Sequence, residues 1–271
     1  MLVGPAFGVG RRRPARSSCE LAAPRTPLLG ASRAAAASAL ALMSVLGLGC
    51  MEGPKSPGEA GAFPLAPGAF WVYRGPVKWT SVGVHRPEQA EMTWRTEVTG
   101  AVHRQHVSGF LLRGFPSDLS WYEAGEPPSE RLVVRVGPTL FYLLEGERAR
   151  AVLARLRDEQ DLLQDLVRES ELFLALPLER GQVLGETAMI TRTDLSYCWT
   201  VEGQEPFEAA GLSGPEPPPG ATEFVLALRS RPDHQVLRFT PGIGITGYRY
   251  VHHGTVSGCD LELVEWGRGR G

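Results

Sequence analysis

The chain lacks several features that would assign it to a common functional class. It has no surplus of positive charge, because 28 basic groups stand against 30 acidic groups and the formal net charge is −2. Without a basic field nothing would hold a phosphate backbone, so we expect no nucleic-acid partner. Its long apolar run, Ala34 to Gly49, would make about 24 Å of helix, which is short of a membrane span. These absences exclude a nucleic-acid binder and a multi-span membrane protein.

Cysteine is scarce as well, with 4 residues in 271. No CxxC pair occurs, which argues against redox or zinc chemistry at the thiols. The sequence also contains no HExxH and no GxSxG, the motifs of common metallopeptidases and serine hydrolases. Hydrophobic residues make up 43% of the chain, enough for the core of one ordinary domain.

The first 49 residues differ from the rest of the chain. Six arginines stand there against the single acid Glu20, and an uncharged apolar run ends at Cys50. This order is typical of a signal peptide. The segment Leu46-Gly47-Leu48-Gly49-Cys50 resembles the bacterial lipoprotein signal, in which the cysteine after a small residue is acylated and becomes the new N-terminus. It departs from that pattern at Gly47, where the family favours Leu. An ordinary cleaved signal and an uncleaved anchor are the alternatives.

The resemblance implies a protein of the cell envelope. Lipid on Cys50 would hold the chain to a membrane without a spanning helix, either facing the periplasm or on the surface of the outer membrane. Met51, in place of an Asp after the cysteine, implies the outer membrane. Loss of residues 1–49 leaves 22 basic and 29 acidic groups, a formal charge of −7. Such a domain is repelled by anionic head groups, so the lipid rather than a basic patch must anchor it.

Two cysteines remain once Cys19 leaves with the signal and Cys50 takes the lipid. They are Cys198 and Cys259. An isolated pair in an oxidising compartment is more often bridged than free, so we predict a disulfide between them. Two buried, unpaired thiols are the alternative.

The remainder is predicted to be a short tether followed by one β-rich domain. Residues 50–62 are rich in Gly and Pro, as a linker should be, and the domain covers 63–271. Alternation with period two marks strands: Met92, Trp94, Thr96 and Val98 share one face. Comparable segments are Phe70–Arg74, His106–Phe115, Arg131–Val136, Leu140–Leu144, Leu195–Glu202, Thr222–Ser230, Gln235–Thr240, Ile243–His253 and Asp260–Trp266.

Two segments break this pattern. Residues 147–169 carry apolar side chains at spacings of three, four and seven, which predicts one amphipathic helix lying against the sheet. Residues 203–221 include Gly-Pro-Glu-Pro-Pro-Pro-Gly and predict a long surface loop. We therefore expect a mainly β fold: a curved antiparallel sheet or open barrel of about ten strands packed on one helix, with a β-sandwich as the alternative.

Two motifs invite a chemical interpretation. Gly242-Ile-Gly244-Ile-Thr-Gly247 fits GxGxxG, but an aromatic, β-branched strand follows where a nucleotide site needs a helix. We expect these glycines to permit a bend or bulge. His252 and His253 are weak metal candidates, because neighbouring strand residues point to opposite faces and cannot easily chelate one ion. We expect no cofactor and no catalytic residue.

The two ends of the domain resemble a group of uncharacterised secreted or lipid-anchored bacterial proteins. The motifs are Phe63-Pro-Leu-Ala-Pro-Gly-Ala-Phe-Trp71 and Pro241-Gly-Ile-Gly-Ile-Thr, the latter leading to His252-His253-Gly-Thr. More remotely, the expected architecture is similar in outline to periplasmic lipoprotein-carrier folds, whose concave face shelters acyl chains. The aromatic residues on the strands could line such a cavity or form a core.

These observations predict a non-enzymatic envelope lipoprotein. It would act as a binding or assembly module with an apolar ligand or an envelope protein as its partner. The alternative is a periplasmic metal-dependent hydrolase that uses His252 or His253.

Overall fold

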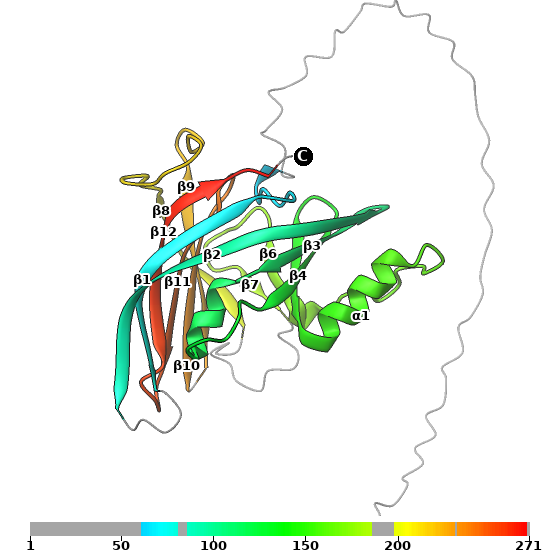
Figure 1. Ribbon diagram of the computed structural model, residues 1–271. Helices are drawn as coiled ribbons and strands as arrows, with labels where there is room; N and C mark the ends of the chain where they lie inside the picture. The colour runs from blue at the N-terminus through cyan, green and yellow to red at the C-terminus, as the bar shows by residue number, and fades with distance from the viewer. Residues whose placement is uncertain (1–60, 81–85, 186–197, 231, 270–271) are drawn as a thin grey trace, which may run out of the picture. The chain divides into compact units, whose positions relative to one another are not determined.

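The computed structural model describes residues 61–80, 86–185, 198–230 and 232–269. Within these ranges the chain forms one antiparallel sheet of twelve strands and one α-helix (Figure 1). The predicted mainly β fold is confirmed, and the β-sandwich alternative is wrong because all the strands belong to a single sheet. The strands are β1 (Phe70–Thr80), β2 (Pro87–Arg104), β3 (Val107–Arg113), β4 (Glu130–Val136), β5 (Leu140–Glu145), β6 (Leu172–Ala175), β7 (Val183–Leu184), β8 (Trp199–Pro206), β9 (Thr222–Arg229), β10 (Asp233–Thr240), β11 (Gly244–His252) and β12 (Gly258–Gly267).

The sheet curls until its two edges nearly meet. Its order is β6-β5-β4-β3-β2-β1-β12-β11-β10-β9-β8-β7, so the first and last strands pair in the middle. The edge strands β6 and β7 lie beside each other without forming a ladder. Across that gap Gln182 Nε2 donates a hydrogen bond of 3.0 Å to the Ala175 carbonyl. The sheet is therefore an open barrel, as predicted, with twelve strands rather than about ten.

The core lies on the concave face. In β1, alternation places Trp71, Tyr73 and Val77 inside the barrel, each at most 1% exposed. The predicted face of β2 behaves in the same way, because Thr96 and Val98 are buried whereas Thr93 and Arg95 are exposed. A 3-10 helix, η2 (Pro116–Trp121), contacts β1, β11 and β12 and places Leu119 in the same core.

The single helix lies against the other face of the sheet. Helix α1 (Gly146–Arg157) buries Ala149, Val152 and Leu156 against Val107 and Leu132 of β3 and β4. The expected contact with the sheet is confirmed, but the range 147–169 is wrong after Arg157. Leu163 and Asp165 have φ of 57° and 48°, outside the helical region. Leu163, Leu166 and Val167 still pack against the sheet. The apolar spacing after Arg157 therefore comes from a loop that folds back on the sheet, not from a longer helix.

The predicted loop 203–221 begins later than expected. Gly203 to Pro206 continue β8 and pair with Thr222 to Val225 of β9, so the loop covers 207–221. The predicted signal 1–49, Cys50 and the tether up to residue 60 lie outside the described residues. In the described part of the chain no helix has the length and apolarity needed to cross a bilayer.

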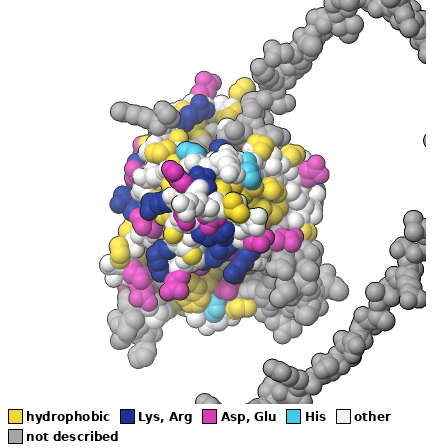
Figure 2. Space-filling view, turned by 90° about the vertical axis from the view of Figure 1, so that its right-hand side faces the viewer, with side chains coloured by type: hydrophobic (Ala, Val, Ile, Leu, Met, Phe, Trp, Pro, Cys, Tyr) yellow, Lys and Arg dark blue, Asp and Glu magenta, His cyan; other side chains and the backbone are white. Residues whose placement is uncertain are grey.

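The surface beside α1 has a mixed charge. In the view of Figure 2, Lys and Arg side chains alternate with Asp and Glu, and apolar side chains lie among them. No single-sign field covers this face in that view.

Candidate functional site

The two motifs from the ends of the domain meet at one end of the barrel. We call this the proximal end and define it by Ala62, Pro218, Pro241 and Arg268. The Gly242 amide donates to the Ala62 carbonyl at 2.7 Å, and Pro218 lies against Gly242. In Figure 1 the start of the domain, the β8–β9 loop and the end of β12 are all near the top of the barrel. The opposite, distal end carries the β11–β12 turn (His253–Ser257) and η2.

Hydrogen bonds explain why these motifs contain their aromatic and glycine residues. Trp71 Nε1 donates to the Ile243 carbonyl at 2.6 Å, and the Tyr73 hydroxyl donates to the Ile245 carbonyl at 3.0 Å. A Cβ at Gly244, whose φ is 108°, would lie 2.9 Å from Phe63 and Trp71. The register shifts beside this segment, between Arg238 and Phe239. The expectation of a bulge is confirmed, and the glycine motif has a packing role.

The aromatic residues form a core rather than the lining of an open cavity. Phe63 is 1% exposed, and its ring centroid lies 5.5–6.5 Å from those of Trp71, Phe141, Phe173 and Phe239. These neighbours come from β1, β5, β6 and β10, so one side chain joins opposite walls of the barrel. Toward the distal end, Ser120 of η2 approaches the Tyr248 hydroxyl within 2.8 Å. Among the described residues, the buried aromatic rings therefore belong to one contiguous hydrophobic core on the concave face.

The proximal end has an apolar surface cavity of about 660 Å³. Its walls belong to the start of the domain, the β8–β9 loop, the start of β9 and the β10–β11 turn, and Arg268 after β12 also lines it. The lining includes Ala62, Pro64, Pro218, Pro219, Phe224 and Pro241. The sequence predicted the proline-rich loop. It gave no sign that three separate segments bring their prolines together at one cavity.

A second cavity, of about 520 Å³, is polar and lies beside the same loop. Glu205, Glu223, Arg238 and Glu262 line it. Glu223 is 8% exposed and accepts a hydrogen bond from Thr246 Oγ1. Burial raises the pKa of Glu223, while the Thr246 bond opposes that shift. This is the most buried carboxylate among the described residues, and sequence alone gives no sign of it.

The distal end contains His252 and the carboxylate nearest to it. His252 pairs across the strands with Asp233, and its Nε2 lies 3.9 Å from Asp233 Oδ1. The same Oδ1 accepts a 2.5 Å hydrogen bond from the Tyr250 hydroxyl. Burial, followed by the bond to Asp233, raises the pKa of Tyr250, so this hydroxyl stays protonated. Trp121, 53% exposed, packs its ring 4.8 Å from that of His252.

His253 belongs to a different set of contacts. Its Nε2 lies 3.3 Å from His234 Nδ1, and its backbone amide donates to the Pro232 carbonyl at 2.6 Å. Burial, with the neighbouring His253, lowers the pKa of His234. Across the described residues no three His, Cys, Asp or Glu side chains form a group suited to a metal ion. The structure therefore places His252 and His253 in separate interactions.

The predicted disulfide is not supported. Cys198 precedes β8 and Cys259 is in β12, with three strands between β8 and β12 in the sheet, and both are free, buried thiols. Burial raises the pKa of Cys259 to about 12, and burial followed by Glu169 raises that of Cys198. The alternative of two buried, unpaired thiols is what the structure contains. Sequence spacing could not reveal this because it says nothing about which strands are neighbours.

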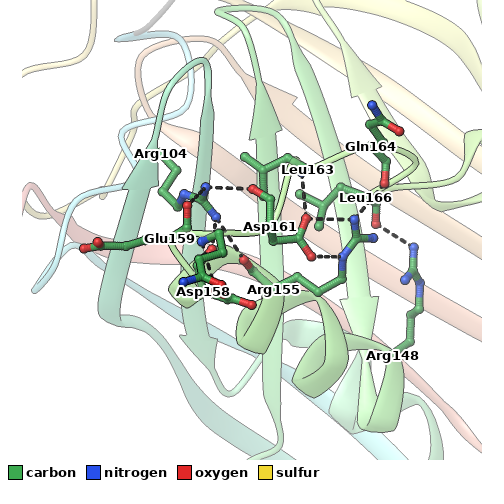
Figure 3. Close-up of polar contacts among 10 residues, drawn as sticks. Arg104, Arg148, Arg155, Asp158, Glu159, Asp161, Leu163, Gln164 and Leu166 are labelled. Atoms are coloured by element: carbon green, nitrogen blue, oxygen red, sulfur yellow. Dashed lines mark hydrogen bonds and ion pairs between the residues drawn. The ribbon is translucent and has the colours of Figure 1, made fainter.

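A cluster of arginines fixes the loop after α1 (Figure 3). Arg104, at the end of β2, donates to the carbonyls of Arg155, Asp158, Glu159 and Asp161. Arg155 pairs with both carboxylate oxygens of Asp161, at 2.7 and 3.0 Å. This arrangement satisfies carbonyls at the C-terminus of α1 that the helix leaves without partners. It explains how a loop with two positive φ angles stays folded against the sheet.

Two solved structures are similar to the chain over most of its length. One is described as a "putative exported protein with YmcC-like fold" from Bacteroides fragilis; it is 9% identical, with a TM-score of 0.36, over 75% of this chain and 97% of that one. The other is a "putative lipoprotein" from Parabacteroides distasonis, 11% identical, with a TM-score of 0.30 and the same coverages. No protein-family model and no curated sequence matches the chain.

Proposed function

We propose that the chain is a lipid-anchored lipoprotein of the cell envelope that acts as a non-enzymatic binding or assembly module. The anchor would be acyl chains on Cys50, exposed as the N-terminus once residues 1–49 are removed. The segment Leu46–Cys50 supports this, since a small residue precedes the cysteine at the end of an uncharged run. Two or more acyl chains suffice for stable anchoring without a spanning helix.

The proposal that the protein is not an enzyme rests on one observation. Side chains of the protein itself occupy the concave face of the barrel. Phe63 and its four aromatic neighbours pack against one another inside the barrel, where other barrels enclose a ligand. The carboxylate next to His252 already accepts a bond from Tyr250. A partner would therefore bind to the outer surface or to one of the two ends of the barrel. Such binding suits a rigid protein module that another molecule recognises, rather than an enzyme with an enclosed active site.

The proposal includes a location, on the periplasmic face of a membrane or on the surface of the outer membrane. The formal charge of −7 after removal of residues 1–49 supports anchoring by lipid, because head-group attraction would need the opposite sign. The partner we propose is an envelope protein or an apolar molecule held at the surface.

Labelling with radioactive palmitate tests the anchor. We expect the wild-type chain to incorporate label and to fractionate with membranes. The Cys50→Ala variant should lose both properties, while Cys19→Ala, a matched change within the predicted signal, should keep them. Equal labelling of the wild-type and Cys50→Ala chains would refute the lipoprotein assignment.

A further inference from the structure

We infer that the proximal end of the barrel is a membrane-docking surface that lies against the phospholipid bilayer in which the protein is anchored. This inference rests on the proposed function, because it takes Cys50 as the point of attachment. It goes beyond that function by naming one surface of the domain and its partner, a lipid surface. The argument follows from the chemistry of that end, the length of the tether and the position of one cation.

The chemistry of the proximal end suits contact with the apolar edge of a bilayer. The cavity there is lined by Ala62, Phe224 and the prolines 64, 218, 219 and 241. Proline has no backbone N–H, so these positions leave fewer donors that must stay hydrated. Nearby backbone groups are already paired: the Ala221 amide donates to the Pro218 carbonyl, and the Phe207 amide to the Ala221 carbonyl. Covering this apolar cavity with lipid would therefore desolvate few unpaired backbone groups, while the neighbouring polar cavity, with the carboxylates of Glu205, Glu223 and Glu262, stays in water at its edge.

The length of the tether favours this end over the other. Gly61 follows Cys50 by eleven residues, which reach at most about 40 Å when extended. Gly61 is the first described residue, so this reach is the greatest distance at which Cys50 can lie from the start of the domain. The distal end lies a further strand away, about 35 Å for the eleven residues of β1. Anchoring at Cys50 thus raises the local concentration of lipid mainly at the proximal end.

Arg268 supplies one cation at the proximal end. It follows β12, lines the apolar cavity and is exposed, with its guanidinium carbon 5.6 Å from the centre of the Trp266 ring. A guanidinium can pair with phosphate in a bidentate manner, so Arg268 is placed to contact a head group while the prolines face the glycerol and acyl region. The distal end offers the exposed Trp121 as a competing lipid contact, but that end is disfavoured by the reach of the tether.

Depth-dependent fluorescence quenching tests this orientation. The mature lipidated protein, which begins at Cys50, is reconstituted in vesicles of phosphatidylethanolamine and phosphatidylcholine at a ratio of 3 to 1, whose head groups carry no net charge. A bimane label is placed at Pro219→Cys or, as the matched distal control, at Val256→Cys. Cys198 and Cys259 are buried and Cys50 would be acylated, so the introduced thiol is the reactive one. We expect nitroxide lipids to quench the label at position 219 more than twofold better than the label at position 256.

A replacement variant and two further measurements complete the test of the docking surface. If Pro219→Cys does not fold, Glu216→Cys in the same loop replaces it. Equal quenching at both ends, or stronger quenching at position 256, overturns the inference. A copurified apolar molecule found by native mass spectrometry, or a dimer that shields position 219, would assign the surface to another occupant and also overturn it. Palmitate labelling is scored separately: its absence refutes the proposed function, whereas labelled protein without the quenching difference refutes only the docking surface.

Discussion

At the scale of single residues, the contact between the two motifs depends on Trp71. Its Nε1 donates to the Ile243 carbonyl inside the core. Trp71→Phe keeps an aromatic ring but leaves that carbonyl without its donor, which should lower the free energy of unfolding by about 1–3 kcal/mol. Urea denaturation measures the change. Trp94→Phe is the matched control, because the Gly114 carbonyl that Trp94 contacts also accepts a bond from Thr96. An equal loss in both variants would contradict the role assigned to Trp71.

Glu223 predicts a pH dependence of stability. Burial raises its pKa in the folded state, so the native protein binds this proton more tightly than the unfolded chain does. Stability from this group is therefore greatest at low pH and falls as the pH rises from the ordinary glutamate value through the raised one. Glu223→Gln keeps an acceptor for Thr246 but does not ionise, so it should gain stability relative to wild type between pH 4 and pH 8.

Urea denaturation at the two pH values measures the Glu223 effect, with the exposed Glu216→Gln as control. The control should follow the wild-type pH profile. Parallel profiles for Glu223→Gln and wild type would show that the carboxylate ionises normally in the folded protein.

At the scale of elements, the loop after α1 is held by side-chain donors rather than by helix geometry. Arg104 reaches four carbonyls, and a lysine cannot present the same planar set of donors. Arg104→Lys should speed hydrogen exchange at the Leu163 amide by about tenfold, as expected from losing one or two hydrogen bonds. Arg113→Lys, at a side chain 56% exposed, should leave that rate unchanged. Exchange at the wild-type rate in Arg104→Lys would contradict this account.

The same loop shows what an apolar pattern can and cannot predict. The spacing of Val152, Leu156, Leu163 and Leu166 correctly identified side chains that face the sheet. It could not locate the end of the helix, because the carbonyls after Arg157 are satisfied by Arg104, which is about fifty residues earlier in the chain. Sequence periodicity reports burial, whereas the boundary of this helix depends on a contact between distant residues.

For the whole molecule, the sequence was enough for the fold class and for most strands but not for the candidate sites. Alternation predicted β2 and the strands of the C-terminal half, since each has one buried face. It missed β6 and β7, which have four and two residues and are too short to alternate. The apolar cavity and the pairing of Asp233 with Tyr250 also escaped prediction, because each joins segments that only strand order brings together.

Closure of the barrel is a property of the whole sheet and rests on the gap between those two short strands. Gln182 spans the gap by donating to the Ala175 carbonyl, while its Oε1 accepts from the Glu179 amide. Gln182→Glu removes the donor and places a carboxylate against a carbonyl oxygen, which should destabilise the fold by about 1 kcal/mol. Because Phe63 contacts Phe173 of β6, loosening this edge should also expose the core there.

Hydrogen exchange at the Leu176 amide, which donates to the Thr139 carbonyl, reports on this edge, and urea denaturation reports on the fold as a whole. We expect both exchange and unfolding to become easier in Gln182→Glu. The control is Gln164→Glu, the same chemical change at an exposed position in the loop after α1. Unchanged exchange at Leu176 in Gln182→Glu would mean that the two edges are held by packing around Phe63 and Phe173 alone, and that the hydrogen bond across the gap adds nothing to closure.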